Sequence, residues 1–342
     1  MISFYDTYQF CKTLTIRKVL NGTLLRLSYF LSRISGSIIR WGLPESLSIE
    51  PTNLCNLKCP ECPSGNNGLT RPRLFLSETS YRNLIDKNKN YLAFLQLYFQ
   101  GEPFLHPKIY QYIHYATKHR IYTATSTNGQ FLTPENCLKL VDSGLQRLIV
   151  SIDGTTQESY EKYRVGGSLS LALTGIKNLI AAKKHRKKRT PAVIIQFVVF
   201  KTNEHQIPEI KQLAKKLQVD ALKLKSPQLE DFENGHPLMP ENKRYNRYKK
   251  SASGTYFLNK NNRVKCKRAW NGAVLTADNR LIPCCFDKDA KYPYGKLSEG
   301  EGNLKNLWKG ESADRFIKTV WSKDNPIEMC KNCTEGLKQT WF

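Results

Sequence analysis

The sequence predicts an α/β protein in which parallel strands alternate with helices. A content rich in β-branched and aromatic residues marks six strand segments, 46–52, 92–101, 121–129, 148–154, 192–201 and 221–229. Helical spacing of apolar residues fills the intervals, near 78–89, 107–119, 133–143, 156–187 and 204–217. This alternation predicts parallel βαβ units, which form either an open doubly wound sheet or a barrel. In both architectures the functional site lies at the carboxyl edge of the strands.

An amphipathic helix is predicted ahead of the first strand, within residues 1–45. Between Asp6 and Glu45 this segment has no acidic residue and six basic ones. The apolar residues spaced to share one helical face are Leu24, Leu27, Phe30, Leu31, Ile34 and Ile38. Such a helix either rests on an anionic lipid surface or packs across the end of the main domain, and the sequence leaves both alternatives open.

Length and charge limit the class of protein and of partner. The 342 residues suffice for one large barrel or two domains, and 40% hydrophobic with 11% aromatic residues predicts a folded body. The net charge of +24, from 53 Lys and Arg against 29 Asp and Glu, favours an anionic partner. A nucleic acid, an acidic lipid surface, a phosphorylated or sugar-nucleotide substrate and an acidic peptide all satisfy this charge.

The location follows from what the chain lacks. No apolar run approaches the roughly 18 to 20 residues of a membrane-spanning helix, and the N-terminal residues do not have the pattern of a signal peptide. We therefore expect a cytoplasmic protein, with peripheral membrane contact through the N-terminal helix left open.

The ten cysteines fall into two groups. Cys55, Cys59 and Cys62 form the first group, at spacing C-x3-C-x2-C after the first predicted strand. A second group lies in the last quarter of the chain, and only Cys11 and Cys137 stand alone. Its members are Cys266, Cys284, Cys285, Cys330 and Cys333. Two thiolate-rich sites in a reducing compartment explain this clustering better than five disulfides.

Three thiolates leave one coordination position of a metal centre open for substrate or cofactor. Soft thiolate ligands select iron–sulfur clusters, zinc or copper(I). A zinc site completed by His106 or His114 is an alternative, although C-x3-C-x2-C is not the paired C-x2-C spacing of zinc fingers and ribbons.

The first cysteine group, placed after the first strand of a βα series, resembles the motif of the radical S-adenosylmethionine (SAM) superfamily. The resemblance implies a partial (β/α)6 barrel of parallel strands. It also implies a [4Fe-4S] cluster held by Cys55, Cys59 and Cys62, whose fourth iron chelates the amino and carboxylate groups of SAM.

The end of the second strand resembles the Gly-Gly-Glu-Pro motif of this family. Here the sequence is Gln100, Gly101, Glu102 and Pro103, so the first glycine is replaced. The resemblance implies that Glu102 meets the SAM ammonium and that the neighbouring Gly101 and Pro103 complete the contact. A carboxylate can pair with an amine, and a glycine lets backbone approach the ligand.

The ends of the third and fourth strands also resemble the family pattern. The resemblance implies SAM contacts from Asn128, which follows Thr127, and from Ser151, Asp153 and Arg164 around the ribose and the SAM carboxylate. The alternatives are a turn at 127–129, a helix N-cap at Asp153 and a surface ion pair at Arg164.

The C-terminal cysteine group resembles the SPASM domain that follows the barrel in many peptide-modifying radical SAM proteins. Fuller versions carry seven cysteines for two auxiliary clusters, whereas this chain has no further cysteine after Cys333. We therefore expect one auxiliary [4Fe-4S] cluster, ligated by Cys266, Cys284, Cys330 and Cys333. The choice of Cys284 over Cys285 is open, and a four-cysteine zinc site is the alternative.

This resemblance implies a division of the chain and a boundary for each part. Residues 1–45 are the N-terminal helical segment and 46–230 the barrel. The polar stretch 231–262 is a linker, and 263–342 are a small cysteine-rich auxiliary domain.

The resemblance further implies an enzyme that reductively cleaves SAM to a 5′-deoxyadenosyl radical, with an external reductant of flavodoxin or ferredoxin type. The expected substrate is a peptide or protein, and a lipid-linked, sugar or nucleotide substrate at the membrane surface is the alternative. No catalytic acid or base is identified. A rival of another class is a zinc-containing basic RNA-binding module. The sequence shows neither an aromatic stacking platform nor a base-reading helix, so a nucleic-acid partner is not expected.

Overall fold

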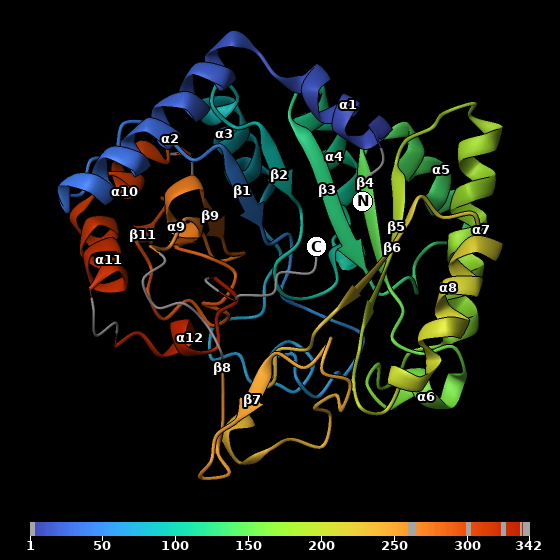
Figure 1. The fold of residues 1–342 in the computed structure, drawn as a ribbon. Coiled ribbons are helices and arrows are strands. Elements are labelled where there is room, and N and C mark those ends of the chain that lie inside the picture. The colour runs from blue at the N-terminus through green and yellow to red at the C-terminus, as the bar shows by residue number, and fades with distance from the viewer. Residues whose placement is uncertain (1–3, 259–264, 299–301, 323–325, 336, 338–342) are drawn as a thin grey trace.

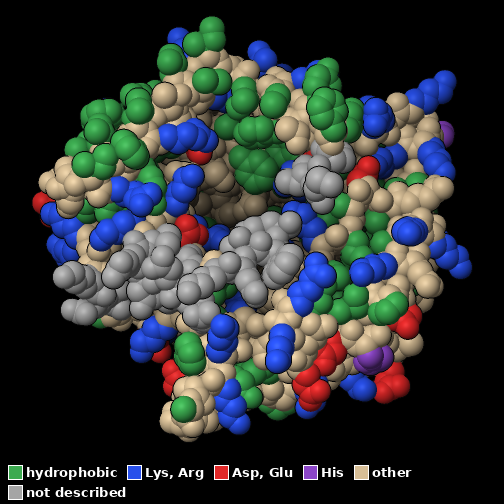
Figure 2. Space-filling view, in the orientation of Figure 1, with side chains coloured by type: hydrophobic (Ala, Val, Ile, Leu, Met, Phe, Trp, Pro, Cys, Tyr) green, Lys and Arg blue, Asp and Glu red, His purple; other side chains and the backbone are tan. Residues whose placement is uncertain are grey.

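The main feature of the fold is one curved sheet (Figure 1), and residues on its inner face line a central hollow (Figure 2). The computed structural model describes residues 4–258, 265–298, 302–322, 326–335 and 337. The sheet has nine strands in the order β11-β10-β9-β1-β2-β3-β4-β5-β6. The first six are β1 (Ser46–Ile49), β2 (Phe94–Gln96), β3 (Tyr122–Thr127), β4 (Arg147–Ser151), β5 (Ala192–Val198) and β6 (Ala221–Lys225). All six pair in parallel, which confirms the predicted strands and the partial (β/α)6 barrel.

Helices follow the strands and lie outside the sheet (Figure 1). They are α3 (Glu78–Asn88), α4 (Ile109–Lys118), α5 (Pro134–Asp142), α6 (Gln157–Glu161), α7 (Leu169–His185) and α8 (Ile207–Lys216). One prediction is wrong, since 156–187 is not one helix. The chain turns between α6 and α7 with Gly166 at φ +81°, and the Ser168 hydroxyl then caps α7 by accepting from the backbone of Leu171. Three short 3-10 turns, η1 (Pro103–Leu105), η2 (Glu204–Gln206) and η3 (Phe232–Asn234), complete the connections.

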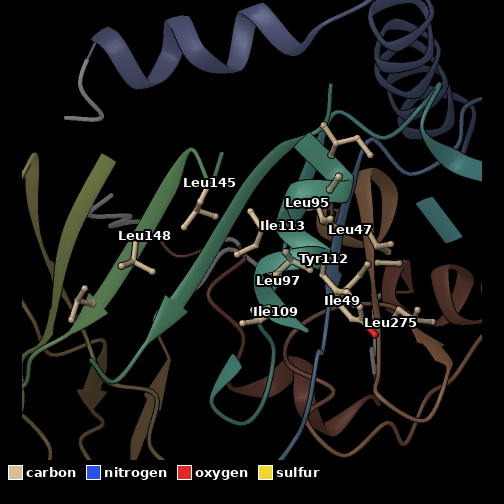
Figure 3. Packing of buried hydrophobic residues seen from close by; sticks show 14 of the residues in the cluster. Leu47, Ile49, Leu95, Leu97, Ile109, Tyr112, Ile113, Leu145, Leu148 and Leu275 are labelled. Atoms are coloured by element: carbon tan, nitrogen blue, oxygen red, sulfur yellow. The ribbon is translucent and has the colours of Figure 1, made fainter. Parts of the chain in front are cut away.

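The core lies between the outer face of the sheet and these helices (Figure 3). Alternate strand residues such as Leu47, Ile49 and Leu95 are buried against Ile113 of α4. The intervening residues face the central hollow instead and are polar, as at Ser48. The hydrophobic effect therefore fixes the outer layer, and the hollow is left for ligands.

The cysteine-rich C-terminal part continues the same sheet. Strand β9 (Gly272–Leu275) pairs in parallel with β1 over four residues, and β10 (Arg280–Ile282) and β11 (Gly295–Lys296) extend it. Four helices accompany these strands: α9 (Arg268–Asn271), α10 (Lys305–Trp308), α11 (Glu311–Trp321) and α12 (Glu328–Lys331). Within the predicted linker, β7 (Tyr248–Lys250) and β8 (Tyr256–Leu258) form a separate hairpin.

Two helices precede the barrel, α1 (Phe4–Thr13) and α2 (Ile16–Ser35). α1 lies over the amino ends of β3 and β4, where the buried Asp6 carboxylate pairs with Arg147 and accepts from the Tyr122 hydroxyl. This end of the barrel is therefore opposite to the carboxyl edge, where the functional site is expected.

Helix α2 buries its polar face and exposes its apolar face, the reverse of an ordinary amphipathic helix. Its buried face is largely polar: Asn21 exchanges two hydrogen bonds of 2.8 Å with the Leu43 backbone, and the Ser28 hydroxyl accepts from the Trp270 indole at 3.2 Å. The predicted apolar face is exposed, with Phe30 at 59% and Ile34 at 69%. α2 therefore packs against the main domain, as one of the two alternatives expected, but it does so through its polar face and leaves the apolar face exposed. Ile38 lies beyond the end of the helix.

Among the described residues, no helix has both the length and the apolar content needed to cross a bilayer.

Candidate functional site

Glu102 lies at the centre of the carboxyl edge and is almost completely buried. Its Oε1 accepts from the Thr127 hydroxyl at 2.9 Å and the Phe104 backbone N–H at 3.1 Å, and its Oε2 accepts from the Asn128 N–H at 2.8 Å. Burial raises the pKa of Glu102 to about 7. Oε2 retains capacity for a further donor, so a cationic amine could bind here and favour the ionised form.

Gly101 allows the cysteine loop to pack directly on the end of β2. Its φ is +76°, and a Cβ at this position would lie 2.5 Å from the Thr52 carbonyl oxygen. Its N–H donates to the Ser64 hydroxyl at 3.0 Å. Gln100, which replaces the first glycine of the motif, places its amide oxygen 3.8 Å from the Cys62 sulfur, and the last residue of the motif, Pro103, begins η1. The departure from the family motif therefore adds a contact to the loop.

Arg164 and Asp153 form a buried pair beside the cysteine loop. The Arg164 guanidinium donates to Asp153 Oδ2 at 2.6 Å and lies 3.8 Å from the Cys59 sulfur. The other Asp153 oxygen accepts from the Val198 N–H at 2.7 Å. Since α6 is capped by Thr156, the alternatives of an N-cap at Asp153 and a surface ion pair at Arg164 are both wrong. Asp153 holds the guanidinium in place.

The remaining two predicted SAM contacts lie nearby. Ser151 ends β4, is buried and pairs in register with Gln196 of β5. The Asn128 amide is already engaged, since it donates to Asn56 at 2.8 Å and its oxygen accepts from the Gln130 N–H at 3.0 Å. The contact from Asn56, inside the cysteine motif, was missed by the sequence analysis because an asparagine in a loop gives no distinctive signal.

Cys55, Cys59 and Cys62 lie in one loop after β1, with Cys59 buried and the other two half-buried. Burial, with smaller contributions from the nearby Glu102, Cys62 and Cys59, raises the pKa of Cys55 to about 11, so the three sulfurs lie in one electrostatic neighbourhood. The Arg164 guanidinium supplies the positive charge that an anionic thiolate centre needs. These residues fit a thiolate-ligated cluster.

No group of three or more His, Cys, Asp and Glu side chains is arranged to hold a single metal ion in the described ranges. A [4Fe-4S] cluster does not require such a group, because each cysteine binds a different iron. For the zinc alternative, both ring nitrogens of His106 are engaged, one at 3.0 Å from the Leu76 carbonyl oxygen and one accepting from the Lys108 N–H at 3.1 Å. His114 is exposed on α4.

The two adjacent members of the second cysteine group differ in exposure: Cys284 is half-buried and Cys285 is exposed. Burial raises the pKa of Cys284 well above its usual value, and its charged neighbours include Cys285, Cys266 and Cys333. Cys333 in turn lies near Cys266 and Cys330, and burial raises its pKa to about 12. Cys285 is exposed at the central hollow. The four cysteines assigned to an auxiliary cluster are thus gathered together.

The comparisons with known proteins agree with this site. Residues 49–214 match the radical SAM superfamily and residues 266–334 match an iron–sulfur cluster-binding domain, SPASM. The mycofactocin maturase MftC of Mycobacterium tuberculosis is 31% identical over 171 residues, 50% of this chain and 42% of the relative. The PqqA peptide cyclase of Rhodopseudomonas palustris is 30% identical over 210 residues, 60% of this chain and 54% of the relative. The chain thus spans about half the length of these relatives.

Among solved structures, Streptococcus suis SuiB bound to S-adenosylmethionine superimposes with a TM-score of 0.64 at 14% identity, over 91% of this chain and 76% of that chain. This likeness shows the fold. The two matched domains assign the cofactors: a [4Fe-4S] cluster with SAM for the first and an auxiliary iron–sulfur cluster for the second. The chain belongs to the radical SAM superfamily and carries a SPASM domain in its C-terminal part.

Proposed function

We propose that this protein is an enzyme that cleaves SAM reductively and removes a hydrogen atom from a substrate held in the central hollow. The observation that carries the proposal is the convergence of the three loop cysteines, the Glu102 carboxylate and the Arg164 guanidinium at one edge of the barrel. The bound cluster and SAM supply the one-electron cleavage that yields methionine and a 5′-deoxyadenosyl radical.

The chain itself would bind and orient the cluster and SAM, and it would exclude water from them. Cys55, Cys59 and Cys62 would hold the cluster, and Glu102 would accept the SAM ammonium at its remaining oxygen position. Arg164, fixed by Asp153, would face the SAM carboxylate. Ser151 and the Gly101 to Pro103 segment would line the rest of the SAM site. The auxiliary cluster would be held by Cys266, Cys284, Cys330 and Cys333.

The named relatives support a peptide or protein substrate. Two are a maturase and a peptide cyclase, and one solved neighbour is SuiB bound to its precursor peptide SuiA. A lipid-linked, sugar or nucleotide substrate is the second candidate, and the positive charge of the residues that line the hollow favours it. We expect the protein to work in the cytoplasm with an external one-electron reductant.

Anaerobic reconstitution with iron, sulfide, SAM and dithionite tests the chemistry. The wild-type chain is expected to form 5′-deoxyadenosine, measured by chromatography, and Cys59→Ser is expected to form none above the protein-free background, because one cluster ligand is lost. Cys11→Ser, a thiol on the exposed side of α1, is the matched control and should keep full activity. A wild-type protein that contains zinc without iron or acid-labile sulfide, and that forms no nucleoside, would instead support the basic binding module.

We also infer that the protein contacts an anionic bilayer peripherally through α1 and α2. The exposed face of α2 is a continuous apolar stripe formed by Ile16, Val19, Leu20, Leu24, Leu27, Phe30, Leu31 and Ile34. Exposed cations flank it at Arg17, Arg26 and Arg33, and Figure 2 shows the apolar side chains gathered over α1 and α2. A broad apolar face bordered by arginines is the pattern of helices that lie in the lipid headgroup region.

Vesicle sedimentation tests this contact. Leu27→Asp combined with Phe30→Asp is expected to weaken binding to phosphatidylglycerol-containing vesicles by about 100-fold or more, since each buried apolar side chain contributes about 1.5 to 3 kcal/mol. Leu171→Asp with Phe257→Asp changes the charge equally at exposed apolar residues elsewhere and should bind as wild type. Equal loss in both double variants would mean that α2 is not the membrane contact.

A further inference from the structure

The central hollow is strongly cationic. It has a volume of about 1400 Å³ and opens on the face shown in Figure 2, where Lys and Arg side chains lie at the sides of the opening. Among the described residues that line it, Glu241 is the one carboxylate, and its 2.7 Å ion pair with Lys201 neutralises it. The cations that line the hollow are Lys201, Lys225, Lys243, Arg244, Arg247, Lys249, Lys250 and Arg268.

Three of these cations come together from different elements. Lys225 ends β6, Arg247 precedes β7, and Arg268 begins α9. All three side chains line the same hollow. Burial and the positive charges of Lys223, Arg268 and Arg247 lower the pKa of Lys225, and nearby Cys285 partly opposes this shift. Of the three, Arg268 has a described carboxylate partner, Glu335 at 3.1 Å.

Arg247 is the clearest sign of an absent ligand. Its Nη2 donates to the Ser226 carbonyl oxygen at 2.7 Å, whereas its Nε and Nη1 are buried and have no partner within the part of the chain that is described. An unsatisfied buried guanidinium beside other cations is costly, and such groups in native proteins are satisfied by a ligand or an ion. The three cations would therefore suit a multiply charged anion.

We propose that Lys225, Arg247 and Arg268 bind a phosphate or diphosphate group of the substrate. The proposal rests on the proposed function, because it names the substrate class for the same hollow. A phosphate ester carries about −1.5 to −2 charge and three acceptor oxygens, and guanidinium groups bind it in a bidentate manner. A peptide carboxylate carries a single charge and can neutralise only one of the three cations.

The rest of the hollow indicates where the remainder of the substrate lies. The part of its wall formed by strands β1 to β5 is neutral and offers the hydroxyl and amide groups of Ser48, Gln96, Ser126 and Gln196. Ser126 directly precedes Thr127, which contacts Glu102, and Gln196 pairs with Ser151. The wall thus connects the cation cluster to the SAM edge and suits a hydroxyl-bearing body, such as a sugar, between the two.

Calorimetric titration of the full chain, reconstituted with its clusters, tests the proposal with inorganic pyrophosphate as the probe. We expect saturable binding that Lys225→Gln and Arg247→Gln each weaken about tenfold or more, because one charged hydrogen-bond donor is lost. Lys215→Gln, an exposed lysine on α8, is the matched control and should bind as wild type. Unchanged iron content and melting temperature show that the variants are folded.

Two further arms identify the source of the phosphate. Saturation by glucose 1-phosphate would indicate a soluble substrate, and binding only to vesicles that contain a polyprenyl phosphate would indicate a lipid-linked one; either result upholds the phosphate site. The proposal is overturned if pyrophosphate does not saturate the protein, if the cavity variants bind as wild type, or if a tetraglutamate peptide binds more tightly than pyrophosphate. Because binding is measured without turnover, a failure to form 5′-deoxyadenosine would count against the proposed function alone.

Discussion

Replacing Arg71 with methionine is expected to lower the free energy of unfolding by about 3 to 5 kcal/mol, because the substitution leaves a buried carboxylate without its partner. Arg71 lies in the loop that follows the three cysteines, and its guanidinium donates two 2.6 Å hydrogen bonds to Glu50. Both side chains are fully buried. Glu50 also accepts from the Ala277 N–H at 2.9 Å, so the pair joins β1, the cysteine loop and the auxiliary strands.

Denaturant unfolding of the apoprotein measures this loss. Arg73→Met is the matched control two residues away: Arg73 is exposed, bonds only to Asn67 among its described contacts, and should cost within about 0.5 kcal/mol. The double replacement Glu50→Leu with Arg71→Met removes both charges and should recover most of the stability. If Arg71→Met unfolds at the wild-type denaturant concentration, the pair does not tie the loop to the sheet.

Replacing Cys284 with serine is expected to reduce the iron content from about eight to about four atoms per chain, because the auxiliary [4Fe-4S] cluster loses a ligand while the SAM-binding cluster remains. The reason lies in the exposure of the two adjacent thiols: Cys284 is half-buried near Cys266 and Cys333, whereas Cys285 is exposed at the hollow. Iron and acid-labile sulfide assays on anaerobically purified protein measure the change.

Cys285→Ser is the matched control for that experiment and should retain about eight irons. It changes the same type of side chain one residue along the chain. If Cys285→Ser loses iron and Cys284→Ser does not, the assignment of the fourth auxiliary ligand is reversed. Zinc in place of iron in the wild-type protein would contradict the auxiliary cluster itself.

Much of the barrel was predictable because its signals are local. The β-branched runs gave the strands and the apolar spacing gave the helices, with one error where Gly166 breaks the predicted helix 156–187. The cysteine spacing and the Gly101 to Pro103 segment marked the SAM site, because each motif lies directly after a strand. The boundaries assigned to the barrel, linker and auxiliary domain, and the ligand roles of the individual residues, stay predictions.

The features that escaped sequence analysis depend on residues far apart in the chain. The spacing of apolar residues in the sequence shows that α2 is amphipathic. Its polar side is the buried one because Leu43 and Trp270, which are distant in the sequence, bond to it. In the same way, Lys225, Arg247 and Arg268 come from three separate parts of the chain, so their spacing in the sequence does not predict that they lie together. The pairing of β9 with β1 could not be predicted either, because it joins strands that are far apart in the sequence.

The sheet runs continuously from β1 into β9, and this would set a condition on any electron transfer between the two cysteine groups. Four residues of each strand are paired in register, and Glu50 and Arg71 connect the same strands through buried charges. Pairing of this kind limits the relative movement of the strands that lead to the two cysteine groups. If each group holds a cluster, the distance between the two clusters would stay nearly constant, and the timing of any electron transfer between them would depend on their potentials or on the substrate.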